Sequence, residues 1–226
     1  MKHRVSHALF TYWNEIRGQR VAPRRFEIEP SRIAAILPDT FILDCGEPGH
    51  HRFRLAGTRM SSMMGRDVRD GELAGLFQRQ DHAAIGHLVG QATDQGAVIV
   101  LTSVAAPLPG MADRPGVDGP EAILQAGDAA PGPRLEILLL PLFHTQEQVT
   151  RLLGCAVSLD PPRPGHGVPP AFQRLLDQET IWPDGRPHSV LQQLNRQSPF
   201  APEHRGGRIV TADRRRFRVF DGGKSP

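Results

Sequence analysis

The sequence predicts a mixed α/β fold, in which one antiparallel sheet and a few helices form a single domain with extensions. Five segments have the apolar patterning of strands, and helical segments lie between the second and third of them. Hydrophobic residues make up 39% of the 226 residues and charged residues 23%, so the chain has enough apolar side chains for a packed core. This length suits one domain better than two.

The N-terminal segment predicts an amphipathic helix over residues 8–17. Leu9, Trp13 and Ile16 share one face of that helix, and Gly18 follows as a stop signal. An arginine-rich connector and a short helix bounded by prolines lead from there to the first strand.

Residues 40–45 and 51–56 predict a β-hairpin with the turn-rich GEPGH between its strands. In the second strand apolar residues alternate with arginines, so one face is expected to be buried and the other wet. Residues 58–64, which contain three methionines, predict a short helical crossing. The longest helical candidate runs from Leu76 to Gln95.

Three more strands are expected at residues 97–104, 134–143 and 151–159. Residues 105–133, between the first two, are rich in Pro, Gly, Ala and Asp. Because loops of this length are uncommon inside a compact domain, we interpret them as a flexible insertion.

Several short stretches of sequence add to this order of elements. They are YWNEIRGQRVAPRR at 12–25, IEP at 28–30, ILPDTFILD at 36–44, FRLAGT at 53–58, GRDV at 65–68, and the paired strands ILLLPL and RLLGCAVSL. Over residues 9–160 the chain resembles a bacterial family of small proteins with a single PAS domain. The resemblance implies a five-stranded antiparallel sheet in the order 2-1-5-4-3 with helices over one face. It also implies a sensing or regulatory role without shared catalytic residues.

We therefore divide the chain into an N-terminal helical cap at 1–39, a PAS domain at 40–160 and a C-terminal extension at 161–226. The extension follows a proline-rich break and has no obvious core of its own. Short helices are expected in it near 171–179 and 189–197.

A PAS domain can hold flavin, haem, a small metabolite or nothing, so the cofactor stays unidentified. Methionine side chains fit irregular ligands, although we favour the interpretation that the three methionines are ordinary core residues. The candidate ligand-binding residues are Phe53, Leu55, Met60, Met63, Phe77, His82 and Ile85.

Haem would need an axial ligand, and His82 or His87 on the long helix could supply it. A five-residue step turns a helix by about 140°, so only one of the two can face a given pocket. The flavin photosensor type needs a reactive cysteine in a helical Asn-Cys-Arg motif, whereas Cys45 and Cys155 both lie on predicted strands. We expect no metal site.

The two cysteines do not make a disulfide framework, which indicates a reduced, cytoplasmic protein. No apolar run approaches the roughly 20 residues of a membrane helix. Because the resemblance makes the first and fifth strands neighbours, we expect Cys45 and Cys155 to lie close together, with Cα atoms within reach of a disulfide.

No nucleophile motif or phosphate-binding glycine loop occurs in the sequence. We therefore expect a regulatory module, not an enzyme, that binds a small molecule or protein partner and signals by association. The alternative is an arginine-rich adaptor. Its C-terminal tail, with seven basic positions at 204–220, would contact nucleic acid or a nucleotide messenger.

A homodimer is also expected from the sequence. The strand at 134–143 is apolar on both faces, and helices over one face leave the other needing cover. A short N-terminal helix with Phe10, Trp13 and Ile16 covers part of that face. We expect a second copy to cover the rest.

Overall fold

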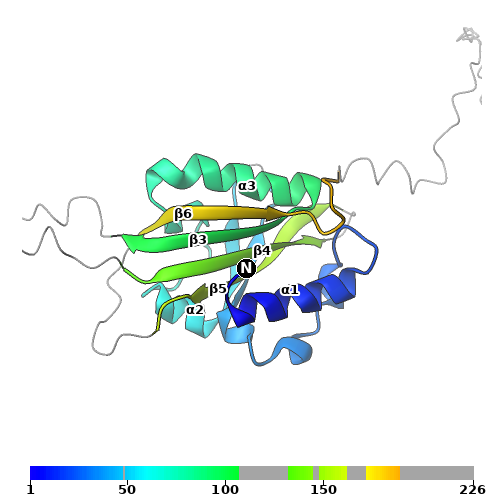
Figure 1. The fold of residues 1–226 in the computed structure, drawn as a ribbon, viewed down its shortest axis with the longest axis horizontal. Coiled ribbons are helices and arrows are strands. Elements are labelled where there is room, and N and C mark those ends of the chain that lie inside the picture. Colours follow the sequence, from blue (N-terminus) through cyan, green and yellow to red (C-terminus); the bar gives the residue numbers. More distant parts are fainter. Residues whose placement is uncertain (48, 107–131, 145–147, 162–171, 189–226) are drawn as a thin grey trace, which may run out of the picture.

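The computed structural model describes residues 1–47, 49–106, 132–144, 148–161 and 172–188. It contains a six-stranded antiparallel sheet in the order β2-β1-β5-β4-β3-β6 (Figure 1). The predicted order 2-1-5-4-3 is confirmed, with a sixth strand added beside β3. The main elements are α1 (Arg4–Arg17), β1 (Thr40–Asp44), β2 (Arg52–Ala56), α2 (Thr58–Met63), α3 (His82–Gln95), β3 (Val98–Ala106), β4 (Arg134–Phe143), β5 (Val149–Ser158) and β6 (Phe172–Ile181).

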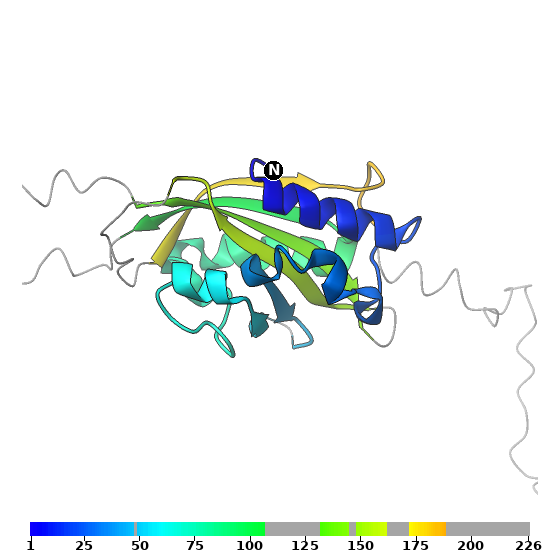
Figure 2. The ribbon, with the colours of Figure 1, turned by 90° about the horizontal axis from the view of Figure 1, so that it is seen from below.

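The helices lie on both faces of the sheet. Figure 2 shows α1 on one side and α2 and α3 on the other. The strand register supports this arrangement. Ser6 of α1 contacts Cys155, which pairs with Leu138 in the sheet, so both strand residues face α1. Gln91 of α3 instead accepts a hydrogen bond from Thr180, on the opposite side of the sheet. We call the α1 side the outer face and the α3 side the inner face.

Helix α1 is held to the outer face by its apolar residues and by one buried polar contact. Leu9 and Trp13 are completely buried, and the indole N–H of Trp13 donates to the Pro141 carbonyl at 2.8 Å. Trp13 therefore belongs to the core of one chain and is not free to form the expected dimer contact. Phe10 and Ile16, the other two residues of that prediction, are partly buried against the core.

The outer face of the sheet is covered within one chain. Leu138, Leu140, Val98 and Val100, which point to this face, are all buried. The reason for expecting a second copy over these positions was therefore wrong, because α1 and the residues before it already cover them. Whether the protein associates with itself stays a prediction.

Strand β6 replaces the helix expected near 171–179. It pairs with β3 from Phe172 to Ile181, with a bulge near Ser103, whose hydroxyl donates to the buried Gln173 side chain at 3.0 Å. Phe172, Leu175 and Leu176 have helical spacing. The segment forms a strand because the open edge of β3 offers backbone N–H and C=O groups that a helix could not pair with. The expected helix at 189–197 and residues 107–131 of the insertion lie outside the described residues.

The two cysteines do not lie together. In the β1–β5 register Cys155 is opposite Thr40, while the Cys45 N–H donates to the Thr150 carbonyl. Five residue steps separate them, roughly 16 Å along the strands, and an odd step puts them on opposite faces. The prediction of neighbouring thiols was wrong because it assumed a register that strand order alone does not determine.

Among the helices that the structure describes, none is long and apolar enough to cross a membrane.

Candidate ligand-binding groove

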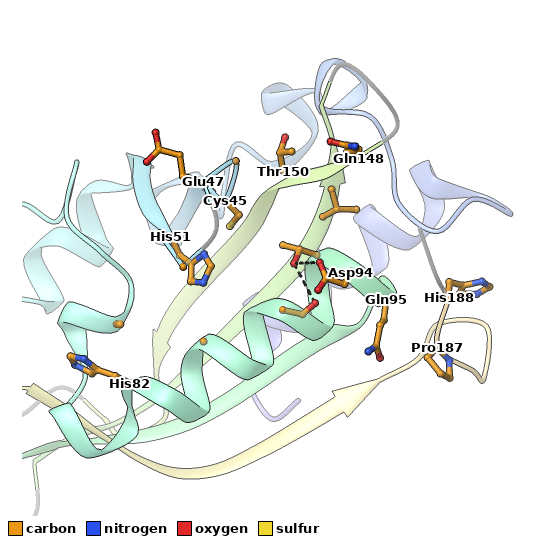
Figure 3. Close-up of a pocket in the computed structure, with 17 residues that line it drawn as sticks. Cys45, Glu47, His51, His82, Asp94, Gln95, Gln148, Thr150, Pro187 and His188 are labelled. Carbon is orange, nitrogen blue, oxygen red and sulfur yellow. Dashed lines mark hydrogen bonds between the residues drawn. The ribbon is translucent and has the colours of Figure 1, made fainter. Parts of the chain in front are cut away.

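An open groove of about 1360 Å³ runs along α3 on the inner face, and we call it the α3 groove. One wall is α3, and the other is formed by the residues that join β1 to β2 together with the start of β5 (Figure 3). Pro187 and His188, which follow β6, lie at one end. Segments far apart in the sequence therefore meet around it.

Two glycines form the middle of the α3 wall. His82, Gly86 and Gly90 follow one another at four-residue steps and so share one helix face, while Ile85 and Val89 point into the core. A Cβ added at Gly86 or Gly90 would meet nothing within 4 Å. A glycine inside a helix costs about 1 kcal/mol relative to alanine. These glycines thus widen the groove and do not serve close packing.

The opposite wall carries Cys45 and His51, both of which point toward the groove in Figure 3. Burial raises the pKa of the Cys45 thiol to about 12, and the nearby Asp44 and Glu72 carboxylates add to the shift. A thiol is nucleophilic only as its thiolate, so Cys45 is an inert apolar surface at neutral pH.

His51 presents a hydrogen-bonding atom to this wall. Burial lowers the pKa of its imidazole below the ordinary 6.5, so the ring is neutral at pH 7. Its backbone N–H donates to Glu72 at 2.8 Å, which holds the residue in place. The ring Nδ1 is buried without a hydrogen-bond partner. Because an unsatisfied buried polar atom costs free energy, His51 is suited to bonding a ligand.

The charge of the groove is acidic. Glu47 and Asp94 line it, and no Lys or Arg is found among the described lining residues. The arginines of β2 point elsewhere: Arg54 pairs with Asp44 at 3.0 Å, and Arg52 pairs with Glu72 at 3.1 Å. A neutral or cationic ligand fits this surface better than an anion.

Of the residues predicted to bind a ligand, His82 is the one that lines the groove. Four others, Phe53, Met60, Phe77 and Ile85, are buried in the core, and Met63 packs partly buried against it. The side chain of Leu55 is 52% exposed, on β2 and away from the groove. The preferred interpretation of the methionines as core residues agrees with this placement.

The two helix histidines point in different directions, as their spacing indicated. His82 lines the groove, and its Nε2 donates to the Phe77 carbonyl at 3.1 Å. His87 is exposed, and its ring lies 3.3 Å from the Gln91 amide. An axial bond from His82 Nε2 to haem would require this hydrogen bond to break.

Sequence reasoning missed Cys45, His51, Gly86, Gly90 and His188 as lining residues. The four-residue spacing of His82, Gly86 and Gly90 was a usable signal for one wall of a groove. Nothing local marked His188, because it reaches the groove only through the pairing of β6 with β3.

The sequence model of the PAS domain matches residues 1–112, which span α1, β1, β2, α2, α3 and β3. Comparisons with curated proteins and with solved structures found no match. Strands β4 and β5 complete the sheet order that the resemblance implied. The chain therefore contains a PAS-type domain.

Proposed function

We propose that this protein is a regulatory sensor module that binds a small molecule in the α3 groove and signals by association with a protein partner. A PAS domain supports a regulatory sensing role in general. The observation that carries the finer proposal is the pair of α3 glycines, which keeps space open at a cost in helix stability. The unpartnered His51 Nδ1 on the opposite wall adds to it.

The ligand we expect is small and neutral or cationic, with hydrogen-bond donors. Neutral His51 offers an unpartnered ring nitrogen at Nδ1, while Glu47 and Asp94 offer carboxylates. We propose no catalytic role for the groove. The support for this is the raised pKa of the Cys45 thiol, which keeps the thiol protonated at neutral pH. A cytoplasmic location remains part of the proposal and rests on the cysteine content.

Native mass spectrometry tests this proposal. The purified protein is incubated with the low-molecular-weight fraction of a cell extract and then weighed intact. We expect a bound mass on the wild type that is lost in Gly90→Leu, whose side chain projects into the middle of the groove. The control is Gly75→Leu, because Gly75 also has open space around its Cβ but does not line the groove. A wild type without bound mass, or the same mass on Gly90→Leu, would overturn the proposal.

The adaptor alternative depends on residues 204–220, which lie outside the described residues. It predicts co-purifying absorbance at 260 nm that falls as salt is raised, because contacts with phosphates release counterions. No observation in the described part of the chain favours it over ligand sensing.

A further inference from the structure

The turn after β6 connects the α3 groove on the inner face to α1 on the outer face. Asp184 lies between the two: its Oδ1 is 3.1 Å from Arg17 Nη1, and its Oδ2 is 2.9 Å from His188 Nε2, a close contact that lacks hydrogen-bond geometry. Arg17 is the last residue of α1, whereas His188 lines the groove. The Asp184 carboxylate therefore contacts both the last residue of α1 and a residue that lines the groove.

On the groove side the turn is attached to the end of α3. The His188 N–H donates to the Gln95 carbonyl at 2.9 Å, and Gln95 also lines the groove. Figure 3 shows Gln95, Pro187 and His188 gathered at the same end of the groove. A ligand that occupies this end contacts the turn directly.

On the α1 side the contact is buried. Arg17 is 5% exposed, and its guanidinium lies over the Trp13 ring at 5.5 Å. The guanidinium also donates to the Asn14 side chain and the Arg20 carbonyl, which are neutral acceptors. Asp184 supplies the negative charge. Loss of the charged partner of a buried ion is strongly destabilising, so α1 is sensitive to the position of Asp184.

We propose that this turn transmits occupancy of the α3 groove to α1 through His188, Asp184 and Arg17. A ligand at the Gln95 end displaces His188 and Asp184, which weakens the hold on Arg17 and loosens the C-terminal part of α1. This inference rests on the proposed function, because it describes how that site is regulated. In one state α1 is packed on the sheet, and in the other its C-terminal part is loosened. The coupling free energy between the groove and α1 equals the difference in the free energy of ligand binding between these two states.

A tethered occupant tests the link without a known ligand. Cys155 is buried and Cys45 half-buried, and burial raises the pKa of both thiols to about 12, so Gly90→Cys introduces a more reactive thiol into the groove. The full chain is labelled with N-(1-pyrenyl)maleimide, and hydrogen exchange of α1 amides is followed by mass spectrometry. We expect exchange in the C-terminal part of α1 to accelerate about fivefold or more on labelling. Labelled Gly75→Cys, outside the groove, is the matched control and should leave α1 unchanged.

A second variant separates transmission from mere structural support. His188→Ala removes the imidazole that lies against Asp184 but keeps the backbone bond to Gln95 and the Arg17–Asp184 pair, so its unlabelled α1 should exchange as slowly as the wild type. In this background we expect labelling at position 90 to lose its effect. Unchanged or slowed α1 exchange after labelling, or the same acceleration in His188→Ala, overturns the link. Because the label is the occupant, these outcomes are independent of the native mass measurement that tests ligand binding itself.

Discussion

At the scale of single residues, the two glycines of α3 are the least expected feature of the groove. They occupy the middle of a helix, where alanine is preferred, and an added Cβ would contact nothing at either position. Their cost in helix stability is understandable if the open space at this wall serves a function. Ligand binding would be such a use, and stability measurements can separate it from packing.

We predict that Gly86→Ala and Gly90→Ala each stabilise the protein by about 0.5–1 kcal/mol, because alanine has the higher helix propensity. Urea unfolding followed by circular dichroism measures this. Gly96→Ala is the control and should destabilise the fold, because Gly96 has φ 71° and its added Cβ would lie 2.2 Å from Val21 Cγ1. Destabilisation by the α3 substitutions would show that the glycines serve packing after all.

A second residue-scale prediction concerns Glu136, a completely buried carboxylate beneath the N-terminus of α1. Burial raises its pKa, but hydrogen bonds from Ser6, His3 and Lys2 outweigh this and bring the pKa below the ordinary 4.5. A depressed folded pKa means that the carboxylate stabilises the fold above pH 4.5. This stability is lost as the pH falls through the folded pKa.

Glu136→Gln should therefore lower the free energy of unfolding at pH 7, and its difference from the wild type should shrink below pH 4.5. Urea unfolding at a series of pH values measures both. A difference that stays constant from pH 7 to pH 3 would contradict the role of the charge.

At the scale of elements, β6 and the turn after it add ion pairs near both ends of α1, whose middle packs on β4 and β5. Glu179 of β6 pairs with the N-terminal amine at 2.9 Å, and Asp184 of the next turn pairs with Arg17. Both ends of α1 are thus anchored to one segment. Within the described residues, β6 also covers the edge of β3, which would otherwise present unpaired backbone groups.

A chain that ends at residue 161 should therefore be less stable than one that ends at 188 and should aggregate through the bare β3 edge. Thermal unfolding and light scattering of the two truncations measure these effects. Equal stability and equal solubility of the two truncations would show that β6 does not stabilise the fold or protect the edge of β3.

At the scale of the whole molecule, self-association is open to a direct measurement. We predict that the wild type sediments at micromolar concentration as a dimer, with twice the 24.9 kDa mass of the chain. Of the three residues expected at the interface, Phe10 and Ile16 keep part of their surface exposed on α1, so Phe10→Ser and Ile16→Ser are the suitable interface variants. A wild type that sediments as a single chain rejects the dimer.

Trp13→Ala does not test the interface. Because Trp13 is fully buried, its loss should cost the fold about 3–5 kcal/mol whether or not the protein associates. Guanidinium unfolding measures this cost, and a loss below about 1 kcal/mol would contradict the core position of Trp13.

The sequence by itself determined the helices and strands through β5 and, through its resemblance to PAS proteins, their order in the sheet. Helical spacing in α1 and the apolar–charged alternation in β2 are local patterns, so residues close in the chain suffice to predict these elements. The alternation did not predict burial throughout, because Phe53 is buried but Leu55 is exposed. The same patterns marked Phe53, Met60, Phe77 and Ile85 as apolar but did not say whether they line a cavity or fill the core.

Only the tertiary structure decided the position of β6, the separation of Cys45 and Cys155, and the composition of the α3 groove. Each depends on pairing between distant segments. Phe172–Ile181 becomes a strand because the edge of β3 is available, and the β1–β5 register places the two thiols on opposite faces. His188 reaches the groove for the same reason, since strand pairing is a long-range contact that local sequence patterns do not encode.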